Sequence, residues 1–180
     1  PVRAVPGTGL KVPVWILGSS LFGAQLAAML GLPYAFASHF APSQLMQAIE
    51  IYRDNFKPSE QLDRPYVMLG FNVVAADTDA EAGVLATSLQ EAFVNLPRGR
   101  PTKPPPPLPG YLDHLGPAER ALLDSVLSCT AIGSPETVKR SLLAFIERTG
   151  ADELMIAGQI FDHPARLRSF EIVAGLGLMG

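Results

Sequence analysis

The segment 12–30 constrains the fold more than any other, because it has the pattern of a strand that passes directly into a helix. Residues 14–17 form a continuous apolar run with two β-branched residues, which is typical of a parallel-sheet strand covered on both faces. Gly18 permits close backbone approach, and Ser19 or Ser20 can cap the helix that follows. The segment therefore predicts a strand–turn–helix junction of an α/β protein.

Such a junction is a candidate site for an anion. The free N–H groups of the first helical turn, the serine hydroxyls and the positive end of the helix converge there. The sequence carries neither Gly-x-Gly-x-x-Gly nor Gly-Lys-Ser/Thr at this turn, so no known phosphate fingerprint applies. Two interpretations stay open: Ser20 caps the helix and nothing binds, or a phosphate binds at Gly18, Ser19 and Ser20.

Strand and helix patterns alternate along the rest of the chain. Helix boundaries carry clear signals. Gly31 is suited to end the first helix, and later helices have N-cap residues at Asp77 or Thr78, at Ser134 and at Asp162. Strands and helices linked in this order predict an α/β fold with a parallel sheet. The expected strands are 14–17, 33–38, 66–75 and 152–160, and the expected helices are 20–30, 43–55, 77–96, 117–128, 135–149 and 163–175.

The segment 97–110 is rich in proline, with seven of the seventeen prolines of the chain and four of them consecutive at 104–107. Neither a helix nor a central strand tolerates this composition, so an extended, mobile loop is expected. A linker and a lid are both compatible with such a loop. Its length inside a compact α/β domain favours the lid.

Composition excludes several classes of protein and site. The net charge is −3 and Lys and Arg do not cluster, so no nucleic acid is expected as a partner. No apolar run approaches the length of a membrane span. Cys129 is the single cysteine, which indicates a reduced thiol and a cytoplasmic protein. The histidines at 39, 114 and 163 are too dispersed to form a metal site.

Several stretches together resemble the bacterial-luciferase-like flavin-dependent monooxygenases. They keep the family's order along nearly the whole chain: VPVWILGSSLFGAQLAAMLGLPYAFASHFAP, RPYVMLGFNVVAADTDAEA, IGSPETV and GADELMIAGQIFDHPARLRSFEIVA. Members are TIM-type (β/α)8 barrels, and the resemblance is to their C-terminal half only. It implies that residues 1–180 form one domain of four β/α units with parallel strands, and that the N-terminal half of the barrel is missing.

The resemblance also implies a cofactor site. In the family, reduced FMN lies at the C-terminal ends of the barrel strands, where barrel enzymes place their sites. The family's phosphate position falls here on Gly18, Ser19 and Ser20. Its flavin-ring position falls on Ala37, Ser38 and His39. His39 keeps two interpretations, a contact to flavin or a structural histidine bonded to a loop carbonyl. Gln159 is a weaker candidate contact, and 97–110 would close over the flavin.

The implied function is that of an FMN-dependent monooxygenase or oxidoreductase. It would use O2 and reduced FMN, supplied by a reductase or by NAD(P)H, to oxidise a small organic substrate, with no catalytic protein residue identified and no metal. The alternatives are a deazaflavin-dependent oxidoreductase of the same fold and a non-catalytic half-barrel assembly module. An open sheet exposes two edges and an apolar face, so we expect weak FMN binding, and either a homo-oligomer or association with the missing N-terminal half.

Overall fold

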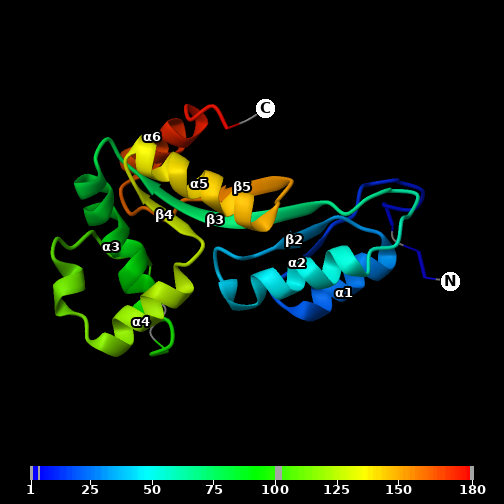
Figure 1. The fold of residues 1–180 in the computed structure, drawn as a ribbon, viewed down its shortest axis with the longest axis horizontal. Helices are drawn as coiled ribbons and strands as arrows, with labels where there is room; N and C mark the ends of the chain where they lie inside the picture. The colour runs from blue at the N-terminus through cyan, green and yellow to red at the C-terminus, as the bar shows by residue number, and fades with distance from the viewer. Residues whose placement is uncertain (1, 4, 100–102, 179–180) are drawn as a thin grey trace.

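The computed structural model describes residues 2–3, 5–99 and 103–178, and Figure 1 shows a sheet with helices on either side of it. Within these residues the sheet has five parallel strands, which confirms the predicted α/β class. They are β1 (Ile16–Gly18), β2 (Tyr34–Phe36), β3 (Val67–Ala75), β4 (Thr130–Gly133) and β5 (Glu153–Ala157). The helices are α1 (Leu21–Leu30), η1 (Pro42–Gln44), α2 (Leu45–Asp54), α3 (Asp79–Asn95), η2 (Tyr111–His114), α4 (Pro117–Val126), α5 (Pro135–Thr149) and α6 (His163–Ala174).

The long strand β3 organises the sheet, because three other strands pair with it. The first residue of β2 bonds the carbonyl of Tyr66, and the residue before β5 bonds the carbonyl of Val67. Successive carbonyls of a strand point to opposite edges, so β2 and β5 lie on opposite edges of β3. The amide of Asn72 bonds the carbonyl that precedes β4, which places β4 beyond β2 on the same edge. Among the described strands, β1 pairs only with β2, and β5 pairs only with β3.

The strand count differs from the prediction of four. The strand that was not predicted is β4, which pairs with the second half of β3 from Asn72↔Thr130 to Ala75↔Gly133. It was missed because the Gly-Ser-Pro at its end is a strong helix start and dominated the pattern of this segment. The boundaries of the other strands shift by at most three residues, and the predicted helix 43–55 begins with the 3-10 turn η1.

Three of the predicted helix caps are confirmed by their hydrogen bonds. The side chains of Thr78, Ser134 and Asp162 accept the backbone N–H three residues further on, at 3.2, 3.5 and 2.8 Å. Gly31 ends α1 with φ of 63°, a conformation that glycine adopts without a Cβ penalty. These local signals were readable because each depends on one turn of chain.

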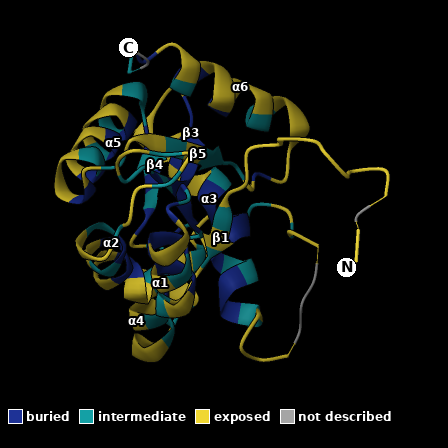
Figure 2. Cartoon of the chain, turned by 90° about the vertical axis from the view of Figure 1, so that its right-hand side faces the viewer, coloured by how far each residue is buried: buried dark blue, intermediate teal, exposed yellow. Residues whose placement is uncertain are grey.

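The outer face of the sheet is covered by α1, α2, α5 and α6. Alternate strand side chains enter this core. The strand β2 and all but one residue of β3 are buried, and Figure 2 colours such buried residues dark blue in the middle of the molecule. The largest of them are fully or almost fully buried: Tyr34, Phe36, Val67, Leu69 and Phe71. Helices and strands together therefore form one continuous hydrophobic core on this side.

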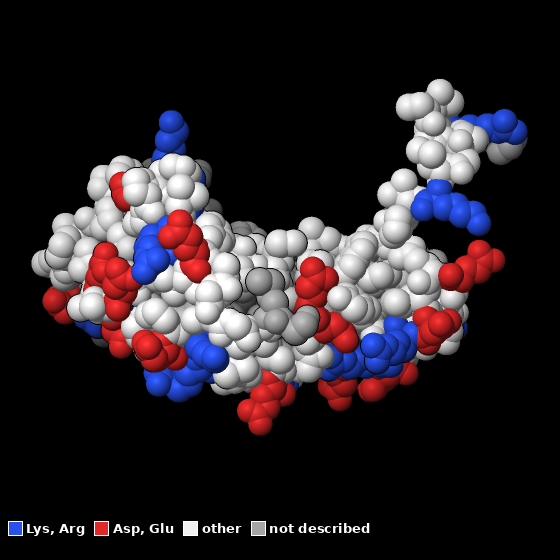
Figure 3. All heavy atoms as spheres, turned by 90° about the horizontal axis from the view of Figure 1, so that it is seen from above, with Lys and Arg blue, Asp and Glu red and all other residues white. Residues whose placement is uncertain are grey.

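The inner face, on the opposite side of the same strands, is open around β1, β2 and β5. Leu17 is 72% exposed, Met155 53% and Trp15 37%. The prediction that the 14–17 strand is covered on both faces is therefore wrong, because β1 has helices on its outer face alone. In Figure 3 the charged side chains gather on the helix-bearing side, and the opposite margin is hollowed and mostly uncharged.

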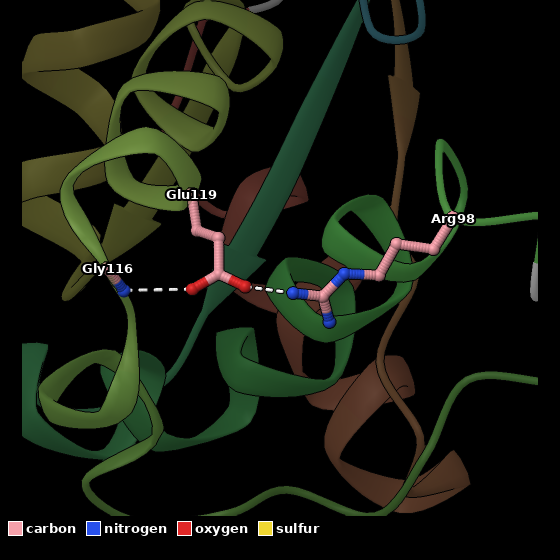
Figure 4. A network of polar contacts seen from close by, with 3 residues as sticks. All are labelled: Arg98, Gly116 and Glu119. Atoms are coloured by element: carbon pink, nitrogen blue, oxygen red, sulfur yellow. Dashed lines mark hydrogen bonds and ion pairs between the residues drawn. The ribbon is translucent and has the colours of Figure 1, made fainter.

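Beyond the C-terminal end of β3, α3 and α4 form a second hydrophobic cluster on the inner side. Val74 contributes to it together with Leu89 and Phe93 of α3 and Leu123 of α4. Figure 4 shows how the two helices are joined at their ends: Arg98 pairs with Glu119, whose other carboxylate oxygen accepts the N–H of Gly116 at 2.8 Å. Together α3 and α4, the α3–α4 unit, therefore cover the inner face near the C-terminal end of β3.

The proline-rich segment lies between α3 and η2. Residues 97–99 and 103–110 have neither helix nor strand, as predicted, whereas 100–102 lie outside the described residues. The N–H of Leu108 donates to the Thr87 hydroxyl at 2.8 Å. The end of the loop is therefore attached to α3.

Candidate functional site

The turn between β1 and α1 leaves the start of the helix available to a ligand. Ser20 occupies the N-cap position, yet within the described residues its hydroxyl makes no capping hydrogen bond. Ser19 and Ser20 are both exposed, and the first turn of α1 has no acidic residue. The first N–H groups of a helix have no partner within the helix itself, so here they and two hydroxyls remain free for an anion.

Contacts to β2 hold this turn in place. The amide of Ala37 donates to the Gly18 carbonyl at 2.9 Å. The phenol of Tyr34 donates to the Ser20 carbonyl at 3.3 Å, and burial raises the pKa of Tyr34 to about 12, so the donor stays protonated. A Cβ at Gly18 would lie at an ordinary 3.7 Å from the Gly23 Cα. The sequence suggested that Gly18 is needed for close approach of the backbone, but the fold leaves room for a Cβ at this position.

The end of β2 brings Ser38 and His39 against β3. Ser38 is fully buried, and its hydroxyl donates to the Gly70 carbonyl at 2.7 Å. The ring of His39 lies over Gly70, where any Cβ would overlap it. Gly70 is therefore the position at which the site needs a glycine, and the Ser38 hydroxyl is engaged within the sheet.

His39 Nδ1 is buried and has no hydrogen-bond partner among the described residues. The structural interpretation of His39 expected a hydrogen bond from its ring to a loop carbonyl. Nδ1 makes no such bond within the described residues. Burial lowers the pKa of His39, which favours the neutral imidazole at neutral pH. A neutral ring with an unpartnered nitrogen can accept or donate one hydrogen bond, according to its tautomer.

Asn72 was missed in the sequence, although it belongs to this site. Its Nδ2 donates to the His39 carbonyl at 2.7 Å and lies 3.5 Å from the Thr130 hydroxyl. Its Oδ1 is buried without a partner in the described part of the chain. The signal was present in the sequence, because a single asparagine interrupts the apolar strand VMLGFNVVA. Buried polar groups normally find partners, so such an interruption indicates a structural or functional demand.

An open hollow of about 380 Å³ lies on the inner face beside the β1–α1 turn. Its walls are almost entirely apolar, with the His39 ring as their polar part. The lining residues are Trp15, Leu17, Ala35, Phe36, Ala37, His39, Met68, Gly70 and Met155. The Ala37–Gly18 hydrogen bond joins the hollow to the turn. The arrangement can hold a molecule that combines an anionic group with an apolar, flat body.

The other candidates lie elsewhere. Gln159 is exposed two residues beyond the end of β5, His114 ends η2, and His163 lies 2.8 Å from Arg166 at the start of α6. Among the described residues no group of three or more His, Cys, Asp or Glu could hold a metal ion. No described helix has the length and apolarity to cross a membrane.

Comparison with known proteins identifies close relatives. The family model of the luciferase-like monooxygenases matches residues 1–153. A protein of Escherichia coli K12 named luciferase-like monooxygenase is 52% identical over 171 residues, which cover 95% of this chain and 51% of that protein. The uncharacterized protein YvbT of Bacillus subtilis is 48% identical over 173 residues, 96% of this chain and 52% of its own length. The chain thus spans about half the length of these relatives.

Solved structures share the fold. Apo-MsnO8 is 31% identical and superimposes with a TM-score of 0.84 over 98% of this chain and 54% of its own. The oxygenating constituent of 3,6-diketocamphane monooxygenase from Pseudomonas putida, solved with FMN, is 18% identical, with a TM-score of 0.53 over 89% and 46%. The F420-dependent tetrahydromethanopterin reductase of Methanopyrus kandleri is 10% identical, with a TM-score of 0.56 over 92% and 50%. The last two are similar in fold alone.

Proposed function

The chain belongs to the luciferase-like monooxygenase family, and we propose that it forms the C-terminal half of the barrel of an FMN-dependent monooxygenase. In this proposal residues 1–180 are one domain, and the small organic substrate reacts with O2 at the C-terminal ends of the strands. The family relationship supports the reaction class. The contacts around the β1–α1 turn support the choice of cofactor site.

The observation that carries the proposal is the uncapped start of α1 beside an apolar hollow. The free N–H groups of α1 and the hydroxyls of Ser19 and Ser20 offer donors to a phosphate, and the helix dipole favours its negative charge. The hollow next to Ala37 and His39 offers apolar contact to a flat ring. A flavin mononucleotide combines these two chemical features in one molecule.

Each residue of the predicted site then has a distinct role. Gly18, Ser19 and Ser20 hold the phosphate, and Ala37 contacts the ring. Ser38 fixes the end of β2 to Gly70 and so positions the neighbouring residue.

His39, whose ring lies over Gly70 and lines the hollow, contacts the ring system of the flavin. Reduced FMN supplies the reaction with O2, in which one oxygen atom goes to the substrate and the other leaves as water. The apolar walls would exclude bulk water from that reaction once another element covers the open side of the hollow. His39 is neutral at neutral pH because burial lowers its pKa, so it brings no charge to the ring.

The proline-rich segment 97–110 is proposed as the lid of this site. Thr87 holds its end near α3 through Leu108, and the Arg98–Glu119 pair joins its start to α4. Both attachments belong to the α3–α4 unit, which lies beyond the C-terminal end of β3. A loop that is attached near its two ends is suited to closing over a ligand.

A second candidate function is assembly without catalysis. Exposed apolar side chains on the inner face, Leu17 and Met155 above all, and the single-sided pairing of β1 and β5 favour burial against another surface. The occupant in this proposal is another half-barrel, either the N-terminal half of the family's fold or a second copy of the chain.

A titration of the chain with FMN, followed by flavin fluorescence, tests the cofactor proposal. We expect saturable but weak binding, with a Kd above the micromolar range, that is lost in Ser19→Ala/Ser20→Ala. The matched control is Ser43→Ala/Ser125→Ala, which removes two exposed hydroxyls elsewhere and should bind FMN like the wild type.

Equal binding by the two double variants would contradict the phosphate site. Parallel titration with F420 separates the deazaflavin alternative, because tighter binding of F420 than of FMN would favour it. Failure of both cofactors to bind would leave the assembly function as the better proposal for this chain.

A further inference from the structure

The last part of the proline-rich segment, KPPPPLP at residues 103–109, has a backbone that its own composition fixes. Proline holds φ at about −65°, and a residue before proline is restricted to extended conformations. Every residue of 103–108 except Pro107 precedes a proline. In the structure, residues 104–108 have neither helix, strand nor turn. The stretch is therefore held in the polyproline II conformation.

A polyproline II helix has about three residues per turn, so residues i, i+3 and i+6 lie along one edge. Lys103, Pro106 and Pro109 have this spacing, and all three are exposed. Leu108, on the adjacent edge, is 48% exposed. One edge of the stretch and a large apolar side chain beside it are therefore open to contact from outside the chain.

Hydrogen bonds attach the end of this stretch and leave its middle free. The N–H of Leu108 donates to the Thr87 hydroxyl at 2.8 Å, and its carbonyl accepts the N–H of Tyr111 at 3.1 Å. Among the described residues, the carbonyls of 104–107 accept no hydrogen bond. Lys103 forms no ion pair within the same part of the chain. The stretch thus presents free acceptors and a free cation beside its exposed prolines.

We propose that residues 103–109 are a docking segment for a partner protein with an aromatic-lined groove and an acidic side chain at one end of it. Pro106, Leu108 and Pro109 pack on the aromatic rings, and Tyr or Trp side chains of the groove donate to the free carbonyls. The acidic side chain pairs with Lys103. Since the polyproline II conformation exists before binding, little conformational entropy is lost.

The docking segment is part of the loop proposed as a lid, but its recognition needs no cofactor. None of its residues belongs to the proposed phosphate or ring contacts. The test is made without FMN, and the FMN titration is made without the partner. The two proposals can therefore fail separately.

An SH3 domain is the probe, because its aromatic groove recognises Pro-x-x-Pro segments in this conformation. The domain is one that selects Lys or Arg three residues before the first of these prolines, as in 103–109. In a 1H–15N NMR titration of the labelled chain with the unlabelled domain, we expect shifts at the amides of Lys103, Leu108 and Gly110. The expected Kd is about 100 μM or tighter.

Two double variants separate the edge from the proline content. Pro106→Ala/Pro109→Ala removes two groove contacts and should weaken binding by about tenfold or more. Pro104→Ala/Pro107→Ala removes the same number of prolines from the third edge, which faces away from the groove. This matched control should weaken binding by about threefold or less, through lost stiffness alone.

A charge reversal tests the acidic side of the groove. Lys103→Glu should weaken binding by about fivefold or more, because the carboxylate then faces another carboxylate. Lys57→Glu, at an exposed position outside the loop, is its control and should bind the domain like the wild type.

Absence of shifts in the wild type, or shifts confined to residues outside 103–110, would overturn the proposal. Equal weakening by the two double-proline variants would also overturn it, because the exposed edge would then have no special role. Equal binding by Lys103→Glu and the wild type would contradict the acidic end of the groove.

Discussion

The two faces of the sheet are made by the same strands and the same kinds of residue, yet only one is closed. On the outer face Tyr34, Phe36 and Leu69 are buried under helices. On the inner face Leu17 of the neighbouring strand β1 and Trp15, which directly precedes it, remain exposed. Alternation assigns a side chain to a face, but it does not tell whether another element covers that face.

The contrast extends to polar groups. Buried polar atoms without partners among the described residues include His39 Nδ1, Asn72 Oδ1 and Gln90 Oε1. His39 and Asn72 lie on the inner side of β2 and β3, and Gln90 lies in α3, which covers the inner side further along. The outer face is thus completed by packing, whereas the inner side carries buried polar atoms that lack a partner among the described residues.

The largest expected effect comes from the same substitution made on either face. Leu69→Ala removes a fully buried side chain and should lower the free energy of unfolding by about 2–5 kcal/mol. Leu17→Ala, at a side chain that is 72% exposed, should change it by about 0.5 kcal/mol or less. Urea unfolding measures both. The protein concentration is kept low enough for a single copy, so that self-association does not cover Leu17. Similar losses in the two variants would then mean that the inner face is covered within the monomer.

Self-association gives the next effect. Because the inner face is apolar and open, we expect the chain to elute with a light-scattering mass of at least two copies. Leu17→Asp should shift it towards one copy, since a charge on the inner face is costly to bury. Phe22→Asp, at an exposed apolar position of α1, is the control and should leave the mass unchanged. A monodisperse monomer in the wild type would contradict the expectation.

The smallest expected effect is a pH dependence of stability due to His39. Burial lowers its pKa below the ordinary value of 6.5, so below about pH 6.5 the unfolded chain binds more protons than the folded one. The free energy of unfolding must then fall as the pH decreases through this range.

Urea unfolding at pH 7.5 and pH 5.5 measures this effect in the wild type and in His39→Asn, where the dependence should be smaller. His114→Asn, in the exposed η2 turn, is the control and should resemble the wild type. An identical pH dependence in His39→Asn and the wild type would show that His39 does not titrate differently in the two states.

The sequence predicted local structure better than it predicted which faces of the sheet are covered by other elements. Thr78, Ser134 and Asp162 were recognised as caps because one turn of chain contains both the donor and the acceptor. The apolar run 14–17 gave the strand but not its open face, because coverage depends on elements distant in the sequence. The strand β4 was hidden by the helix signal that follows it directly.

The candidate site was predicted in position but not in detail. The positions of Ser20 and His39 at strand ends were predictable from the strand–turn–helix pattern and the resemblance. The roles of Gly70 and Asn72 depend on contacts between distant segments, such as the Asn72 bond to the His39 carbonyl. Only the polarity of Asn72 within an apolar strand could have indicated them.

The most direct test of the central claim compares FMN with riboflavin, which lacks the phosphate, in a 1H–15N NMR titration of this chain. The account predicts that FMN shifts the amides of Ser20, Leu21 and Phe22 and that riboflavin leaves them in place. It also predicts that both ligands shift Ala37 and His39, because the two share the flavin ring. Equal shifts at the start of α1 with either ligand, or FMN-induced shifts confined to other parts of the chain, would contradict a phosphate site at this turn.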